Sequence, residues 1–109
     1  MKILLVEDEV QLARSILKFL NDQDYLCEWT NSYAEAVEKI GLHFYDCILL
    51  DINLPDGNGL KLLELLRADN KEEGVIIISA NNSLEDKIRG LQIGADDYLA
   101  KPCNPRELV

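Results

Sequence analysis

Short apolar runs alternate with longer amphipathic segments along the whole chain, and this order limits the possible folds more than any other feature. Continuous runs cover residues 3–6, 47–50 and 75–78, a more polar segment covers 26–30, and a short run covers 98–100. Strands of a parallel sheet are buried on both faces, so they read as continuous apolar runs. The segments between them can form the helices that parallel connections need. We therefore predict an α/β fold in which five β-α units form a doubly wound, five-stranded parallel sheet.

The segments between the runs show apolar residues at the spacing of an amphipathic helix. The expected helices cover 10–20, begin at Ser32, run through 60–66, begin again at Ser83, and start once more near Pro105. Ser32 is followed by Glu35 in a capping-box pattern, and Gly41 is the predicted end of that helix. Residues 52–59 are rich in turn formers and are predicted to form a loop. The last helix is too short to cover the sheet, so we expect one domain, residues 1–109, cut within its fifth helix.

Composition and charge limit the possible function classes. The 109 residues carry a formal charge of −9, which opposes non-specific nucleic-acid binding because phosphate backbones attract basic surfaces. Hydrophobic residues make up 48% of the chain, which suits a folded core, and no apolar stretch is long enough to cross a membrane. The cysteines Cys27, Cys47 and Cys103 lack metal-ligand spacing. They are expected to be reduced thiols of a cytoplasmic protein, with Cys47 in the core.

Polar side chains that could carry out chemistry follow four of the five predicted strands. They are Glu7, Asp8 and Glu9 after the first, Asp51 after the third, Ser79 after the fourth, and Lys101 with Pro102 after the fifth. In open α/β sheets the carboxyl ends of the strands form the ligand-binding edge. Three carboxylates gathered there repel one another, so a cation is expected among them. Oxygen ligands favour a hard cation, which predicts Mg²⁺, with Mn²⁺ also possible.

The same residues are suited to phosphoryl transfer. Asp8 and Asp51 are the expected direct ligands of the metal, and Glu7 is expected to reach it through water. A carboxylate can act as the nucleophile in phosphoryl transfer, which makes Asp51 the candidate phosphoacceptor. Lys101 and Ser79 can contact phosphoryl oxygens through an ammonium group and a hydroxyl group.

Four motifs, in this order and spacing, resemble the receiver domain of response regulators, the switch module of bacterial two-component signalling. They are VEDE at 6–9, LLDINLPDGNGL at 49–60, IISA at 77–80 and GADDYLAKP at 94–102. The resemblance implies the flavodoxin-like strand order 2-1-3-4-5 of CheY-like domains. It also implies these roles: Glu7 and Asp8 as the acidic pair, Asp51 as the phosphorylation site, the Asn53 backbone carbonyl as a metal ligand, Ser79 and Tyr98 as the switch pair, and Lys101 as the phosphate-contacting lysine. The Lys101–Pro102 peptide is expected to be cis.

The GADDY segment, followed by KP and PREL, is most similar to the OmpR/PhoB subfamily of transcriptional regulators. That similarity implies phosphorylation by a sensor histidine kinase, followed by homodimerisation through helix 4, strand 5 and helix 5. Lys87, Asp96, Asp97 and Glu107 match charged positions of that dimer face. DNA binding is expected only through a C-terminal effector domain outside this chain. Cys103 departs from the pattern, because many relatives carry Phe there.

Two other functions remain open on the sequence alone. A magnesium-dependent phosphohydrolase would use the same aspartyl intermediate, but the second Asp expected two residues after the nucleophile is Asn53 here. A flavin or dinucleotide carrier would need a glycine- or hydroxyl-rich loop after the first strand, where this chain has EDEV. We therefore expect a signalling switch that catalyses only its own phosphoryl transfer and dephosphorylation. His43 is expected to be solvated, and Trp29 to serve in packing.

Overall fold

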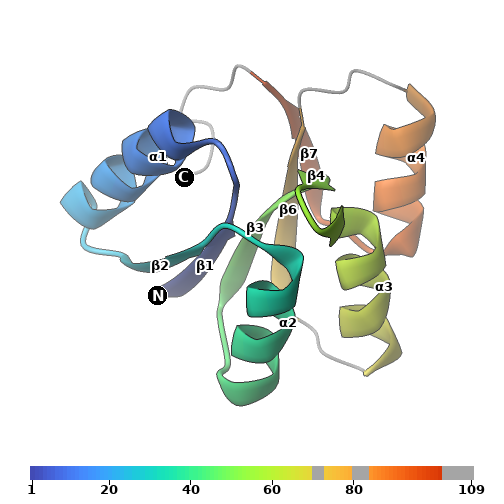
Figure 1. The fold of residues 1–109 in the computed structure, drawn as a ribbon, viewed down its shortest axis with the longest axis horizontal. Coiled ribbons are helices and arrows are strands. Elements are labelled where there is room, and N and C mark those ends of the chain that lie inside the picture. Colours follow the sequence, from blue (N-terminus) through green and yellow to red (C-terminus); the bar gives the residue numbers. More distant parts are fainter. Residues whose placement is uncertain (70–72, 80–83, 102–109) are drawn as a thin grey trace.

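A twisted parallel sheet forms the centre of the molecule (Figure 1). The computed structural model describes residues 1–69, 73–79 and 84–101. The strands of the sheet are β1 (Lys2–Val6), β2 (Leu26–Thr30), β3 (Cys47–Asp51), β6 (Gly74–Ser79) and β7 (Asp97–Ala100). They are hydrogen-bonded in the order β2-β1-β3-β6-β7, and every neighbouring pair is parallel. The predicted fold and strand order are confirmed, since β6 and β7 are the fourth and fifth strands of this sheet.

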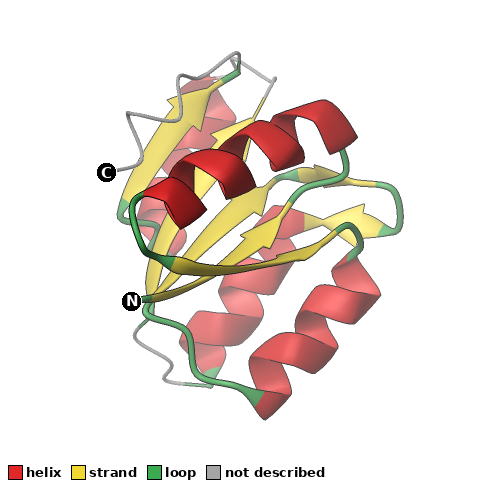
Figure 2. Ribbon diagram, turned by 90° about the vertical axis from the view of Figure 1, so that its left-hand side faces the viewer, coloured by secondary structure: helices red, strands yellow, loops and turns green. Residues whose placement is uncertain are grey.

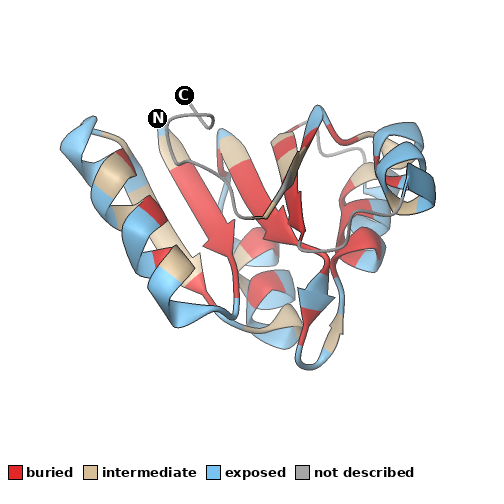
Figure 3. Cartoon of the chain, turned by 90° about the horizontal axis from the view of Figure 1, so that it is seen from above, coloured by how far each residue is buried: buried red, intermediate tan, exposed pale blue. Residues whose placement is uncertain are grey.

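Helices cover both faces of the sheet. They are α1 (Val10–Asp22), α2 (Tyr33–Leu42), α3 (Gly59–Ala68) and α4 (Leu84–Ile93). Figure 2 shows α1 on one face of the sheet and the other described helices on the opposite face. Figure 3 shows that buried residues lie mainly along the central strands and on the inner sides of the helices, while exposed residues lie outside. This arrangement matches the amphipathic spacing of α1, α2 and α3, each of which buries an apolar stripe. In α4 the buried residue is Gly90, while Leu84, Ile88 and Leu91 are exposed.

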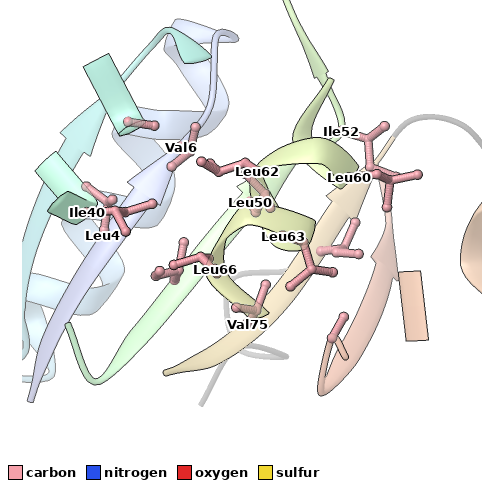
Figure 4. Packing of buried hydrophobic residues seen from close by; sticks show 14 of the residues in the cluster. Leu4, Val6, Ile40, Leu50, Ile52, Leu60, Leu62, Leu63, Leu66 and Val75 are labelled. Carbon is pink, nitrogen blue, oxygen red and sulfur yellow. The ribbon is translucent and has the colours of Figure 1, made fainter. Parts of the chain in front are cut away.

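Alternate side chains of β1, β3, β6 and β7 enter two separate cores. On β1, Leu4 and Val6 enter the core that faces α2 and α3, while Ile3 and Leu5 enter the core that faces α1. Figure 4 shows the first of these cores, in which Leu62 and other leucines of α3 lie over the strands. Because both faces of β1 are buried, every position of its apolar run is occupied by a hydrophobic residue.

The structure confirms the predicted start of α2 but not its end. The Ser32 side chain accepts a hydrogen bond from the Glu35 N–H at 3.2 Å. Gly41 does not end the helix, which continues to Leu42. That prediction is wrong because a glycine ends a helix most effectively through a positive φ, and among the described glycines only Gly94 has one, at 132°.

A short antiparallel hairpin lies in the segment predicted to be a loop. Its strands are β4 (Asn53–Leu54) and β5 (Gly57–Asn58). Asn58 caps α3, because its side-chain oxygen accepts a hydrogen bond from the Leu60 N–H at 2.8 Å. A Cβ atom on Gly59 would clash with the carbonyl oxygen of Asp51, so only glycine fits there. The hairpin therefore brings α3 close against the end of β3.

Some of the remaining sequence predictions concern residues that the structure describes, and others concern residues outside the described ranges. Cys47 is half-buried at the margin of the core facing α1 rather than at its centre, and His43 is exposed as expected. Among the described helices, none is both long and apolar enough to cross a membrane. The expectations outside the described residues concern the helix start at Ser83, the Lys101–Pro102 peptide, Cys103, and the fifth helix with Glu107.

Candidate functional site at the carboxyl edge of the sheet

The carboxyl edge of the sheet brings together residues from distant parts of the chain. Glu7 directly follows β1, Asp51 is the last residue of β3, and Lys101 directly follows β7. The Lys101 ammonium nitrogen (Nζ) lies 2.5 Å from Glu7 Oε1 and 3.3 Å from Asp51 Oδ2. Glu7 and Asp51 are 94 and 50 positions from Lys101 in the chain. Only the shared direction of the parallel strands accounts for their meeting.

Three carboxylates form one cluster at this edge. Glu7, Asp8 and Asp51 each place a carboxylate oxygen within 4.8 Å of the other two. Glu7 and Asp51 are buried, with 1% and 2% of their surfaces exposed, whereas Asp8 is exposed. The acidic cluster, as we call these three residues, is therefore open to solvent at Asp8 and enclosed at its other two members.

Burial changes the acidity of the enclosed groups. It raises the pKa of Glu7 from 4.5 to about 8, although the hydrogen bond from Lys101 acts in the opposite direction. Burial likewise raises the pKa of Asp51. Burial alone would lower the pKa of Lys101, but its contacts with Glu7 and Asp51 raise it overall, so the ammonium group keeps its charge. Among the described residues, Lys101 is the one cation in contact with the cluster, and it faces more negative charge than it can neutralise.

The donor atoms of the acidic cluster fit a hard divalent cation. Glu7 Oε2 is buried and has no hydrogen-bond partner among the described residues, which is costly for a carboxylate oxygen. The cluster supplies the oxygen ligands that Mg²⁺ prefers, and the exposed Asp8 leaves a path for a hydrated ion. The residues present therefore fit the predicted Mg²⁺, and Mn²⁺ shares its preference for oxygen ligands.

Three further predicted residues lie beside the cluster or behind it. The Asn53 N–H donates to Asp51 Oδ1 at 3.2 Å, and the Asn53 side chain is exposed. Ser79 ends β6 and is fully buried, and its carbonyl accepts a hydrogen bond from the Lys101 N–H at 2.8 Å. Tyr98 lies on β7 with 8% of its surface exposed and belongs to the core that faces α2 and α3. The structure therefore shows Tyr98 in a buried position.

The residues assigned to a dimer face differ in their surroundings. Lys87 on α4 and Asp97 at the start of β7 are exposed. Asp96 takes part in a contact within the chain, because its Oδ2 accepts the Val75 N–H at 2.8 Å. The same oxygen lies 3.9 Å from an Arg67 nitrogen. Asp96 thus joins the start of β6 to α3, a structural role that its sequence pattern does not reveal.

Two residues contact the site in ways that the sequence does not predict. Glu9 Oε2 lies 3.7 Å from Lys101 Nζ, which adds an exposed carboxylate to the surroundings of the lysine. The Trp29 indole N–H donates to the Glu7 carbonyl at 2.8 Å, in addition to the packing expected of Trp29. The acidic run after the first strand indicates that Glu9 lies near the site. No local pattern reveals the Trp29 contact, because it depends on the register between β1 and β2.

The fold and this edge define a class of protein, a doubly wound α/β domain with an acidic cluster and a lysine at its ligand-binding edge. The family described as the response regulator receiver domain matches residues 3–109. The chain belongs to this family, so the resemblance seen in its motifs is confirmed.

Individual relatives agree with the family match. The transcriptional regulatory protein PmrA of Pectobacterium parmentieri is 41% identical over 108 residues, which cover 99% of this chain and 49% of PmrA. The receiver domain of the Francisella response regulator 1452 has a TM-score of 0.93 at 36% identity, covering 98% of this chain and 88% of that one. DrrB, a Thermotoga maritima OmpR/PhoB homologue, has a TM-score of 0.88 at 25% identity, covering 98% of this chain and 48% of DrrB. The chain spans about half the length of the curated relatives it matches.

Membership of this family places the chain among signalling domains rather than metabolic enzymes. Receiver domains of two-component response regulators act with histidine kinases and effector domains, and they bind Mg²⁺ at an acidic pocket. The similarity to transcriptional regulators of the OmpR/PhoB type is confirmed by PmrA and DrrB. These findings favour the signalling function over the phosphohydrolase and flavin-carrier alternatives.

Proposed function

We propose that Asp51 accepts a phosphoryl group from a sensor histidine kinase and that the chain is the receiver unit of a longer transcriptional regulator. The observation that carries this proposal is the buried position of the Asp51 carboxylate beside Lys101 at the ligand-binding edge. One Asp51 oxygen accepts the Asn53 N–H at 3.2 Å, and the other lies 3.3 Å from Lys101 Nζ. The carboxylate is thus held in one orientation, which favours its use as a nucleophile.

The proposed reaction moves a phosphoryl group from a kinase histidine to Asp51. An Asp51 oxygen attacks the phosphorus, an O–P bond forms, and the P–N bond to the imidazole breaks. The bonding electrons leave with the imidazole nitrogen, which takes up a proton from solvent. The product is an acyl phosphate on Asp51, and its hydrolysis by water returns the carboxylate. The chain then catalyses only its own phosphoryl transfer and dephosphorylation.

Glu7, Asp8 and Asp51 would hold Mg²⁺, with the Asn53 backbone carbonyl as a further oxygen ligand. When bound, the ion supplies positive charge that offsets these carboxylates and the approaching phosphoryl group. The unsatisfied Glu7 Oε2 supports this assignment, because the described residues leave it without a partner. Asp8 is the exposed member of the cluster, so it would meet the hydrated ion first.

Lys101 and Ser79 are suited to bind the phosphoryl group once it is on Asp51. The Lys101 ammonium group already contacts Asp51, so it can exchange a carboxylate oxygen for a phosphoryl oxygen through a short movement. Ser79 lies at the end of β6, and its hydroxyl can donate to another phosphoryl oxygen. The hydrogen bond from the Lys101 N–H to the Ser79 carbonyl keeps the two residues next to each other.

The proposed switch acts through Tyr98 and the packing of α4. Gly90 of α4 packs so closely on the sheet that a Cβ atom there would lie 2.6 Å from the Ile77 side chain and 3.9 Å from the Tyr98 ring. Tyr98 is already buried, so phosphorylation would stabilise this inward position rather than create it. A change in the population of inward Tyr98 would then change the surface formed by α4 and β7.

This surface is the proposed dimer face. Lys87 and Asp97 are exposed on it, and Asp96 and Glu107 complete the charged set that the OmpR/PhoB similarity assigns. Formation of the dimer would control a DNA-binding effector domain. The proposal draws support from the relatives, since PmrA is a transcriptional regulatory protein about twice as long as the matched segment.

Replacement of Asp51 tests the assignment of the phosphoacceptor. Wild-type protein incubated with acetyl phosphate and Mg²⁺ should gain the mass of one phosphoryl group, whereas Asp51→Ala should gain none. Asp69→Ala, which removes an exposed carboxylate at the end of α3, is the matched control and should be labelled like wild type. Labelling of Asp51→Ala to the wild-type extent would overturn the assignment.

A further inference from the structure

The pairing of β1 with β2 ends just before the acidic cluster. The last register pair is Val6 with Thr30, and the Glu7 N–H still donates to the Thr30 carbonyl at 3.1 Å. The Glu7 carbonyl lies beyond the paired residues of β1, and it accepts the indole N–H of Trp29 at 2.8 Å. Residues of the edge strand β2 therefore hold both polar groups of the Glu7 main chain.

The bonded carbonyl belongs to the peptide that joins Glu7 to Asp8. Because a peptide unit is planar, holding its carbonyl restricts the directions in which both residues leave it. Glu7 directs its carboxylate to Lys101, and Asp8 supplies the exposed carboxylate of the cluster. The indole hydrogen bond thus helps to fix the positions of the Glu7 and Asp8 carboxylates relative to each other.

Trp29 is itself held in place by its surroundings. The residue is half-buried, lies opposite Leu5 in the strand register, and packs against the core that faces α1. Its exposed side borders a surface hollow that Asn31 and Glu35 also line. A bulky ring with two side-chain torsions, packed in this way, presents its N–H in a defined direction.

We propose that Trp29 is a positioning residue for the acidic cluster, and that its indole N–H raises the affinity of the cluster for Mg²⁺ by holding the Glu7–Asp8 peptide. This inference rests on the proposed function, since it takes the cluster to be the Mg²⁺ site. Trp29 acts through the Glu7 carbonyl and not through the ligand oxygens. A role in packing alone would change the stability of the fold and leave Mg²⁺ affinity unchanged.

Trp29→Phe separates these two roles, because it keeps an aromatic ring in the core and removes the N–H. Mg²⁺ affinity, measured by calorimetry, should fall about two- to tenfold, the effect of one lost hydrogen bond. Tyr25→Phe is the matched control, since Tyr25 packs against the same core at the other end of β2, and it should bind Mg²⁺ like wild type. Wild-type affinity in Trp29→Phe would overturn the proposal. Absence of saturable Mg²⁺ binding in the wild type would instead count against the proposed function.

A second measurement uses the unaltered chain. Trp29 is the only tryptophan of the sequence, so its indole N–H gives one assigned NMR signal. This signal should shift as Mg²⁺ is added, with the same midpoint as the calorimetric curve, because its acceptor lies in the Glu7–Asp8 peptide. A signal that stays in place while Mg²⁺ saturates the protein would contradict the positioning role.

Discussion

Each end of the parallel sheet holds a basic side chain among oxygen atoms, and the two arrangements differ in how well they are balanced. At the starts of β6 and β7, the Arg67 guanidinium donates to the Gly94 carbonyl at 2.7 and 3.2 Å and to the Glu73 carbonyl at 3.0 Å. It also lies 3.9 Å from Asp96 Oδ2. Carbonyl dipoles and one partly exposed carboxylate thus surround Arg67, so its charge and its donors are satisfied within the chain.

At the carboxyl end of the sheet, Lys101 has a different environment. Its ammonium group contacts Glu7 and Asp51 and lies 3.7 Å from Glu9, while Asp8 completes the acidic cluster. Negative charge therefore exceeds positive charge among the described residues, and one buried Glu7 oxygen has no partner there. Buried charges that are not fully paired lower stability. One end of the sheet is thus closed by contacts within the chain, whereas the other keeps an excess of carboxylates, which supports its proposed role as the site of a cation and a phosphoryl group.

The largest expected effect is on stability at the amino end. Arg67→Ala would leave the Glu73 and Gly94 carbonyls without their donor and should lower the free energy of unfolding by about 3 kcal/mol. Arg89→Ala is the matched control, because Arg89 makes an exposed ion pair with Glu64 at 3.3 Å and should change stability by less than about 1 kcal/mol. Urea denaturation measures both values. Equal losses of stability in the two variants would show that Arg67 stabilises the fold no more than an exposed arginine does.

The next effect concerns the carboxyl end. Mg²⁺ should raise the melting temperature of the wild type, because a ligand that binds only the folded state adds about 2.7 kcal/mol at a hundredfold excess over its Kd. Asp51→Ala removes one carboxylate of the cluster and should respond much less. Differential scanning calorimetry in calcium-free buffer, with and without Mg²⁺, measures the two melting temperatures. A rise in the melting temperature of Asp51→Ala as large as that of wild type would show that Mg²⁺ does not bind at the acidic cluster.

A further effect should appear as a pH dependence of the stability of metal-free protein. The folded-state pKa of Glu7 is raised from 4.5 to about 8, so folding favours the protonated group. Its contribution to stability is full below pH 4.5 and is lost as the pH rises to about 8. Glu7→Gln cannot ionise and should lose less stability across this range. Urea denaturation in the presence of a chelator tests this, and identical pH slopes for the two proteins would contradict it.

The smallest effect is expected at Glu9. Its side chain is 60% exposed and lies 3.7 Å from Lys101 Nζ, so solvent screens the pair. Glu9→Gln should change the free energy of unfolding by about 0.5 kcal/mol or less. A loss comparable with that of Arg67→Ala would show that Glu9 belongs to the structural core of the site.

Much of the fold and the candidate site could be predicted because the signals are local. Continuous apolar runs mark the strands, and polar residues directly after them mark one edge of the sheet, which is where Glu7, Asp51 and Lys101 meet. Because the strands are parallel, residues that directly follow them lie at the same edge of the sheet and become neighbours in space.

The parts that could not be predicted depend on contacts between distant segments. Arg67 reaches the Gly94 carbonyl across 27 positions, and Trp29 reaches the Glu7 carbonyl across 22. Both contacts require a known register and a known side-chain direction, which no local pattern contains. The hairpin at β4 and β5 was equally hidden, because two-residue strands carry no periodicity.

The most direct measurement locates the phosphoryl group itself. Wild-type protein treated with acetyl phosphate, in parallel with Mg²⁺ and with a chelator, would be reduced with borohydride and digested for mass spectrometry. The contrast between the two ends of the sheet predicts a modification on the peptide that contains Asp51, present with Mg²⁺ and absent with the chelator. Modification of another peptide, or equal modification of Asp51 in the presence of the chelator, would contradict the assignment of the carboxyl edge as a magnesium-dependent phosphoacceptor site.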